Sequence, residues 1–404
     1  MTWISWLTVA IVVATISGIA IGRWPWLRAD RATIAVVGAA ALLACGAMTL
    51  EEAFEALDLD TLLLLFSMMV LNGQLYNAGF FGVVAQRVVR VAHTPRGLLA
   101  LIIVASGVLS ALFLNDTIAL MLTPLVLDTT RTLRRNPIPY LIGLATSANV
   151  GSTATITGNP QNMIIGSASG ISYTAFAAAL APTALIGMAI CWLVIVLVYP
   201  HEFRRGRFET PEVGRMRVYR PLLWKVAVVT PIMLALMIAG VPVALAAFLA
   251  ATALLATRRL RPERIWKTVD WTLLVFFAGL FVVTGSLRVQ GVTDQLFPAT
   301  APFIGGSLIM FGVVTAILSN LISNVPAVLV LQHLIPALPQ PDRGWLMLAA
   351  ASTLAGNLTL IGSVANLIVA ELAARWGVRL TFGAYLHAGV PITVLTLLVA
   401  FVLV

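Results

Sequence analysis

The stretch from Ala145 to Gly170 places polar residues and glycines in the middle of an apolar segment that is long enough to cross a membrane. Its flanks are apolar, whereas its centre reads NVGSTATITGNPQN. An unpaired backbone group in hydrocarbon costs several kcal/mol, so such a break is tolerated only where it is buried in protein or lines a water-filled cavity. The pattern therefore predicts a discontinuous membrane helix whose break forms a binding site.

The rest of the chain has the composition of a polytopic membrane protein. Of its 404 residues, 60% are hydrophobic and 10% are charged, whereas soluble domains carry roughly 25% charged residues. Basic loops face the cytoplasm, and on this rule only Arg288 and Arg343 of the 25 basic residues are expected outside. Membrane orientation, rather than nucleic-acid binding, explains the net charge of +9 and places both termini outside. The acidic stretch from Glu51 to Asp60 is expected to be a solvated outer loop.

Two further features interrupt the series of apolar segments. Residues 97–130 carry Asn115, Asp116 and Thr117 at their centre and have basic residues at both ends, which favours a re-entrant hairpin entering from the cytoplasm. The broken helix, at residues 140–170, follows this hairpin. The charged stretch 200–221 is interpreted as a cytoplasmic linker between two halves.

The second half, residues 222–404, repeats the order of the first half, residues 1–199. A second hairpin is expected at residues 301–336, with Ser323 and Asn324 at its tip, and a second broken helix at residues 345–375. The predicted fold is an all-α polytopic membrane protein with an inverted repeat. About ten crossings, two re-entrant hairpins and two broken helices are expected, a plan that recurs among secondary transporters.

The two tips and the two breaks are expected to meet near the middle of the bilayer. The N-termini of half-helices suit an anion, while carbonyl, Asn, Ser and Thr oxygens suit Na⁺ or a protonated group. The candidate substrate-binding or ion-binding residues are Asn115, Asp116, Thr117, Asn149, Gly151, Ser152, Thr153, Thr155, Gly158, Asn159, Asn162, Ser323, Asn324, Asn357, Thr359, Gly362, Ser363 and Asn366. A sodium ion is expected near Asn115, Asp116 and Asn324 if the coupling ion is Na⁺ rather than H⁺, and no other cofactor is expected.

Asp116 is the one carboxylate that this topology places deep in the membrane. An ionised side chain there is costly unless it is paired, hydrated or protonated. One interpretation is a cation ligand or proton carrier, and the alternative is an acid that caps the second arm of the hairpin at its N-terminus. For the glycines and polar residues of the breaks, the alternative to binding is a kink tolerated by close helix packing.

The motifs LNDTIALMLTP, ANVGSTATITGNPQN, SNVP and TLIGSVANLI resemble those of the ion transporter superfamily. That group includes arsenite permeases, citrate-transporter-like anion permeases, divalent anion/sodium symporters and some sodium/proton antiporters. The resemblance implies a scaffold, a transport domain that moves like an elevator, and frequent homodimers. Dicarboxylate symporters of the group carry Ser-Asn-Thr at both tips, whereas this chain has Asn-Asp-Thr and Ser-Asn-Val, a departure that makes proton coupling or arsenite-type export more credible.

The predicted function is secondary active transport of a small anion or oxyacid, carboxylate or inorganic, across the inner membrane, coupled to H⁺ or Na⁺. The partners expected are this solute, the lipid bilayer and a second copy of the chain, with no nucleic acid. The alternatives are a sodium/proton antiporter without an organic substrate and a passive channel. The sequence has no His-Glu-x-x-His motif and no nucleophile elbow, so an enzyme is not expected.

Overall fold

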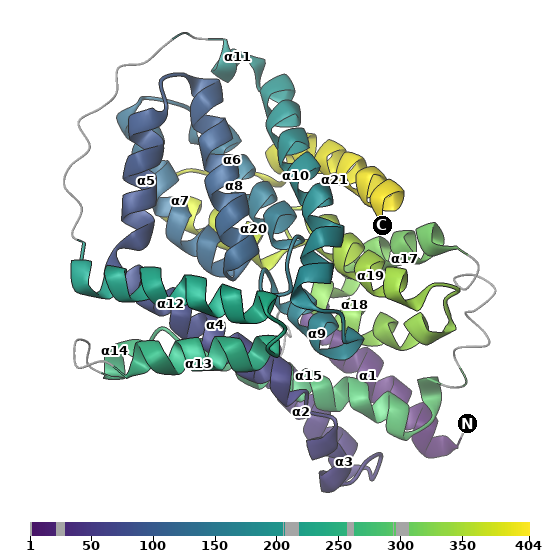
Figure 1. Ribbon diagram of the computed structural model, residues 1–404. Helices are drawn as coiled ribbons and strands as arrows, with labels where there is room; N and C mark the ends of the chain where they lie inside the picture. The colour runs from purple at the N-terminus through teal and green to yellow at the C-terminus, as the bar shows by residue number, and fades with distance from the viewer. Residues whose placement is uncertain are drawn as a thin grey trace.

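The computed structural model describes residues 2–21, 29–204, 218–256, 262–293 and 307–404, together with residues 206 and 295, and all regular structure in these ranges is helical (Figure 1). The helices are α1 (Trp3–Ile21), α2 (Arg31–Ala44), α3 (Leu50–Glu55), α4 (Leu59–Ala78), α5 (Phe80–Val91), α6 (Pro95–Leu112), α7 (Asn115–Thr132), α8 (Pro137–Ser152), α9 (Pro160–Ser169), α10 (Tyr173–Val198), α11 (Pro200–Phe203), α12 (Arg220–Ile238), α13 (Val243–Leu255), α14 (Pro262–Trp266), α15 (Trp271–Val289), α17 (Leu308–Ile322), α18 (Asn324–Leu331), the 3₁₀ helix η1 (Gln332–Ala337), α19 (Pro341–Ala355), α20 (Val364–Arg375) and α21 (Phe382–Leu403).

Seven of the described helices are long and apolar enough to cross a membrane: α1, α4, α6, α10, α12, α15 and α21. Helices α2 and α13, with 14 and 13 residues, are shorter than the roughly 20 residues of a full crossing. The all-helical fold with two hairpins and two broken helices is confirmed. The number of ten crossings and the division into halves stay predictions, and most of the predicted linker lies outside the described residues, as do residues 301–306 of the second hairpin.

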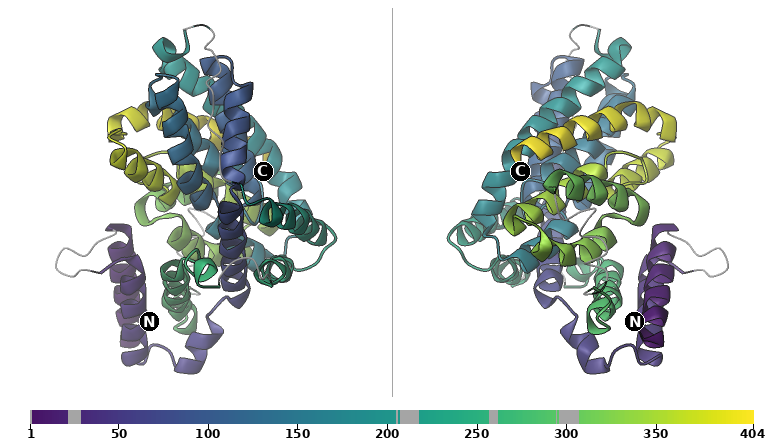
Figure 2. Two further views of the ribbon diagram at one scale, coloured as in Figure 1. Left: turned by 90° about the vertical axis from the view of Figure 1, so that its left-hand side faces the viewer. Right: turned by 90° about the vertical axis from the view of Figure 1, so that its right-hand side faces the viewer.

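Helix α8 lies at the centre of the protein. Every residue from Pro139 to Ser152 is buried, and α8 contacts α6, α7, α10, α19, α20 and α21. Helix α1 lies at the periphery, where it contacts α2 and α15 (Figure 2). Two further close pairs are α2 with α15 and α4 with α13. The first hairpin and the first broken helix therefore share one core with the second broken helix.

Two segments differ from the sequence prediction. The acidic stretch expected to be a loop contains α3, because Thr49 and Glu52 form a reciprocal capping box in which each side chain accepts a hydrogen bond from the other residue's backbone N–H. The segment between the third predicted span and the first hairpin, for which no helix was expected, forms α5. Both helices are short and carry charged residues, so hydropathy alone does not reveal them.

Candidate functional site

The first break separates α8 from α9 and is fully enclosed by protein. Asn159 starts α9 because its side chain accepts a hydrogen bond from the backbone N–H of Asn162 (2.9 Å), and Pro160 fits the first helical turn, where no backbone donor is needed. The side-chain amide of Asn162 in turn donates to the carbonyls of Ser152 (3.1 Å) and Thr155 (2.9 Å). These bonds satisfy carbonyls that the end of α8 leaves without helical partners.

The second break, between α19 and α20, is held by equivalent contacts. The side-chain amide of Asn366 donates to the carbonyls of Gly356 (2.8 Å) and Thr359 (3.2 Å). Asn366, Gly356 and Thr359 align with Asn162, Ser152 and Thr155 at one constant spacing along the chain. The same device therefore closes both breaks, as an internal repeat predicts.

Asn149 connects the two breaks to the first hairpin. Its side-chain oxygen accepts hydrogen bonds from the amide of Asn115 (3.0 Å) and the hydroxyl of Ser363 (3.0 Å). Its side-chain nitrogen donates to the side-chain oxygens of Asn357 (2.8 Å) and Asn366 (3.1 Å). Asn149 is 2% exposed, so these four bonds form a buried polar network that spans both halves of the chain.

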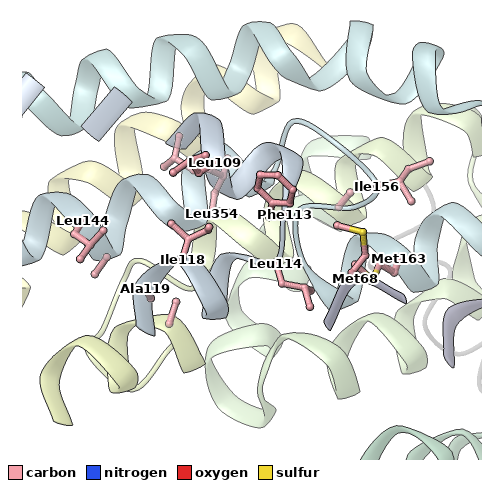
Figure 3. Packing of buried hydrophobic residues seen from close by; sticks show 14 of the residues in the cluster. Met68, Leu109, Phe113, Leu114, Ile118, Ala119, Leu144, Ile156, Met163 and Leu354 are labelled. Atoms are coloured by element: carbon pink, nitrogen blue, oxygen red, sulfur yellow. The ribbon is translucent and has the colours of Figure 1, made fainter. Parts of the chain in front are cut away.

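Each hairpin tip is a tight turn, and the helix of the second arm begins within three residues of the end of the first. Asn115 is the first residue of α7, and its backbone N–H donates to the carbonyl of Gly158 in the break (3.0 Å). Apolar side chains seal this contact, since Phe113 and Leu114 of the turn belong to the same cluster as Ile156 of the break (Figure 3). At the second tip, Ser323 has a positive φ of 80°, and Asn324 begins α18.

Both tips, the start of α9 and the second break border one cavity of about 330 Å³, which we call the tip cavity. Its volume is within the range of small-molecule sites. It is lined by Asp30, Arg31, Ala32, Asn115, Asp116, Pro160, Gln161, Asp270, Thr272, Leu273, Phe276, Phe277, Ser323, Asn324, Val325, Ile361, Gly362, Ser363 and Val364. The N-terminal ends of α2 and α15 thus form the wall opposite the hairpin tips.

Three carboxylates and one guanidinium give the tip cavity its charge. Asp30, at the start of α2, accepts hydrogen bonds from the backbone N–H and the hydroxyl of Thr33, which hold its pKa below the usual value. Asp116 lies in the first turn of α7, where Arg31 attracts its charge and Asp270 repels it. The residue at the N-cap position of α7 is Leu114, which makes no side-chain bond, and the carboxylate of Asp116 lies in the first turn, where the helix dipole favours an acid.

The predicted site residues fall into two groups. Asn115, Asp116, Ser323, Asn324, Gly362 and Ser363 line the tip cavity. The other predicted residues lie behind the cavity. Thr155 donates a hydrogen bond to the carbonyl of Ala111, and Thr117 accepts one from Asn72 (3.2 Å). Buried hydrogen bonds around the two breaks involve Asn149, Ser152, Thr153, Asn159, Asn162, Asn357, Thr359 and Asn366. Gly151 and Gly158 pack so closely on neighbouring backbone that a Cβ atom would lie 2.1 Å and 2.3 Å from carbonyl oxygens of Gly107 and Ser152.

Sequence reasoning missed the cavity wall formed by α2 and α15, including Arg31 and Asp270. Asp270 begins an apolar helix and accepts a hydrogen bond from the backbone N–H of Leu273 (3.0 Å), the mark of an ordinary helix cap. In the sequence, Arg31 indicates only that its loop faces the cytoplasm. Neither residue carries a local signal for a site, because the packing of these helices across the hairpin tips is non-local.

A helical membrane protein with paired hairpins and broken helices around a polar cavity belongs to the class of membrane transporters. A family model described as citrate transporter matches residues 16–355, and the chain belongs to that family. A solved structure of the YdaH transporter of Alcanivorax borkumensis has the same fold, with a TM-score of 0.65 at 15% identity, covering 99% of this chain and 97% of that chain.

Several relatives match this chain along most of its length. The silicon efflux transporter LSI3 of Oryza sativa subsp. japonica is 31% identical, covering 91% of this chain and 91% of the relative. The inner membrane protein YbiR of Escherichia coli is 30% identical, covering 86% and 88%. The putative transporter arsB of Dictyostelium discoideum is 24% identical, covering 92% and 87%. The resemblance to the ion transporter superfamily is therefore confirmed.

Proposed function

We propose that this protein is a secondary active transporter of the inner membrane that moves a small hydroxylated oxyacid or monoanion in exchange or symport with H⁺ or Na⁺. The observation that carries the proposal is the tip cavity, where both hairpin tips, the start of α9, the second break and the carboxylate of Asp116 meet. A discontinuous site of this kind suits alternating access. A passive pore would not need a carboxylate at a membrane-embedded tip, where its charge is costly.

The charges of the cavity favour an uncharged or singly charged solute. Arg31 is the one cation among the described lining residues, which also include Asp30, Asp116 and Asp270. A dicarboxylate or tricarboxylate would meet a wall with an excess of negative charge, whereas a neutral oxyacid can donate its hydroxyls to carboxylates and amide oxygens. The rice relative is named a silicon efflux transporter, which is consistent with a solute of this class.

Asp116 is the proposed coupling group. It lies in the first turn of α7 between the positive charge of Arg31 and the negative charge of Asp270. Binding of H⁺ or Na⁺ at this carboxylate would neutralise one of the three acids of the cavity, and this makes the entry of a singly charged anion easier. Solute and coupling ion would then favour each other's binding.

A sodium/proton antiporter is the second candidate, and the acidic lining of the cavity is the specific observation that favours it. The carboxylate oxygens of Asp116 and the amide oxygens of Asn115 and Asn324 are ligands that suit Na⁺ as well as a hydrogen-bonded solute. In this case the carboxylate would exchange one cation for another without an oxyacid.

Uptake into proteoliposomes separates these functions. Arsenite, silicic acid, phosphate, sulfate, citrate and succinate are offered in turn under imposed H⁺ or Na⁺ gradients. We expect an oxyacid to accumulate above its external concentration with one gradient only. Exchange of Na⁺ for H⁺ with no solute movement would replace this proposal by the antiporter, and solutes that only equilibrate would replace it by a channel.

A further inference from the structure

A second cavity, of about 240 Å³, lies beyond the tip cavity, and we call it the distal cavity. It is bordered by the end of α9, the second half of α15, η1 and the segment before α4. The basic-loop rule places this end of α15 on the outer side. The two cavities are therefore expected to face opposite sides of the membrane.

One stripe of α15 lines both cavities. Asp270, Leu273 and Phe277 border the tip cavity, and Phe281, Thr284 and Arg288 border the distal cavity. Steps of three or four residues keep these side chains on a single face of the helix. With a rise of 1.5 Å per residue, Leu273 and Thr284 lie about 16 Å apart along the helix axis.

Helices α9 and α18 also line both cavities. In α9, Gln161 borders the tip cavity, and Ile164 and Ser167 border the distal cavity. In α18 and its continuation, Val325 borders the tip cavity, and Leu329 and Gln332 border the distal cavity. Three helices thus each present one face to both cavities in the same order. Two unrelated surface pockets would not be expected to share three helix faces.

Two neighbouring aromatic side chains of the stripe border the two cavities, Phe277 the tip cavity and Phe281 the distal cavity. Phe277 and Phe281 are 1% and 4% exposed, and their ring centroids lie 6.2 Å apart. They are consecutive members of the stripe on α15. Within the lining of the distal cavity, the hydroxyl of Ser167 donates a hydrogen bond to the carboxylate of Asp58 (3.0 Å), which joins the end of α9 to the cap of α4.

The distal cavity carries a cation of its own, Arg288, which lines it together with His333, Glu55 and Asp58. Arg288 is exposed, and among the described residues no carboxylate lies within 4.0 Å of it. Its charge is therefore available to a solute in the cavity, as the charge of Arg31 is in the tip cavity.

We propose that the distal cavity is the outward-facing end of the translocation route, at which Arg288 attracts an oxyacid or its monoanion, and that the route follows the stripe on α15 past Phe277 and Phe281. This inference rests on the proposed transport function. It adds a second solute position and assigns a role to a cation that lies far along α15 from the hairpin tips.

Thiol labelling tests the inference without knowledge of the solute. In a background with Cys45→Ala and Cys191→Ala, Ala168→Cys places a thiol in the distal cavity and Thr272→Cys places one in the tip cavity. Both positions are exposed. An anionic and a cationic methanethiosulfonate reagent are each applied to right-side-out and to inverted membrane vesicles. The four labelling rates are then compared at each of the two cysteine positions.

We expect Ala168→Cys to react from the outer side and Thr272→Cys from the cytoplasmic side. At Ala168→Cys, Arg288→Gln should lower the ratio of anionic to cationic labelling rates about fivefold, since one unit charge acts with opposite sign on the two reagents. Arg288→Lys should preserve the ratio, and at Thr272→Cys the ratio should not respond to Arg288→Gln. An unchanged ratio at Ala168→Cys, or reaction there from the cytoplasmic side alone, would overturn the inference.

The same variant connects the distal cavity to transport. Labelling of Ala168→Cys from outside should stop solute movement in proteoliposomes, because the adduct fills the route. The reference is the transport rate of the same variant before labelling. Unchanged transport after complete labelling would refute the inference while leaving the transport function intact. If the unlabelled protein moves no solute of the panel, it is the proposed function that fails.

Discussion

Asn149→Leu should destabilise the protein more than any nearby change of similar size. The substitution preserves the number and branching of the side-chain heavy atoms but removes four hydrogen bonds at once. It leaves polar atoms of Asn115, Ser363, Asn357 and Asn366 buried without those partners. Hydrogen bonds between membrane helices contribute roughly 0.6–1 kcal/mol each. The expected loss in the free energy of unfolding is therefore about 2–4 kcal/mol.

Reversible unfolding in mixed detergent micelles, followed by circular dichroism, measures this loss. Thr396→Val is the matched control, because within the described part of the chain the buried hydroxyl of Thr396 bonds only to carbonyls of Ile392 and Thr393 in its own helix. This control should cost less than about 1 kcal/mol. If Asn149→Leu changes the free energy of unfolding by no more than the control does, the network does not hold the two breaks together.

Two further stability predictions use the same assay. Gly151→Ala should lower the free energy of unfolding by about 2–3 kcal/mol, because the added Cβ would lie 2.1 Å from the carbonyl oxygen of Gly107. Gly383→Ala should be neutral or slightly stabilising, because no described atom lies within 4 Å of its added Cβ. Equal effects of the two substitutions would contradict the close packing at Gly151. Glu202→Ala should cost about 3 kcal/mol, since it removes a carboxylate that pairs with Arg135 at 3.2 Å. Both side chains of this pair are nearly buried, at 11% and 12% exposure. Glu371→Ala breaks a pair in which both side chains are 69% exposed and should cost less than about 1 kcal/mol, so a reversed order of these two costs would refute the burial argument.

Local sequence signals were sufficient for the broken helices. Asn159 followed by Pro160 is a favoured start of a helix, and the polar residues before it cannot remain in hydrocarbon without partners. The same reasoning found both hairpins and their order. These features could be predicted because each depends on a few neighbouring residues and on the repetition of a motif.

The sequence does not reveal which of the polar residues line the cavity and which form the buried hydrogen-bond network. Asn149 and Asn115 are both polar residues in apolar surroundings, yet one lies at the centre of a closed network and the other borders the cavity. The difference depends on how α8 and α20 pack, which involves residues more than 200 positions apart in the chain. The charges of Arg31 and Asp270 likewise enter the site through helix packing rather than through any motif.

The most direct test of the account compares two kinds of flux through Asp116→Asn. In proteoliposomes, solute accumulation driven by an H⁺ or Na⁺ gradient reports coupling, and exchange of labelled for unlabelled solute without a gradient reports binding and movement. Asp128→Asn is the matched control, since this acid lies in α7 but is exposed and outside the cavity.

We predict that Asp116→Asn loses accumulation but retains exchange, while Asp128→Asn behaves like the wild type in both. This result would identify Asp116 as the group that connects the ion gradient to the solute. Accumulation by Asp116→Asn at the wild-type level, with unchanged dependence on pH or Na⁺, would contradict the central claim that the tip cavity couples transport through this carboxylate.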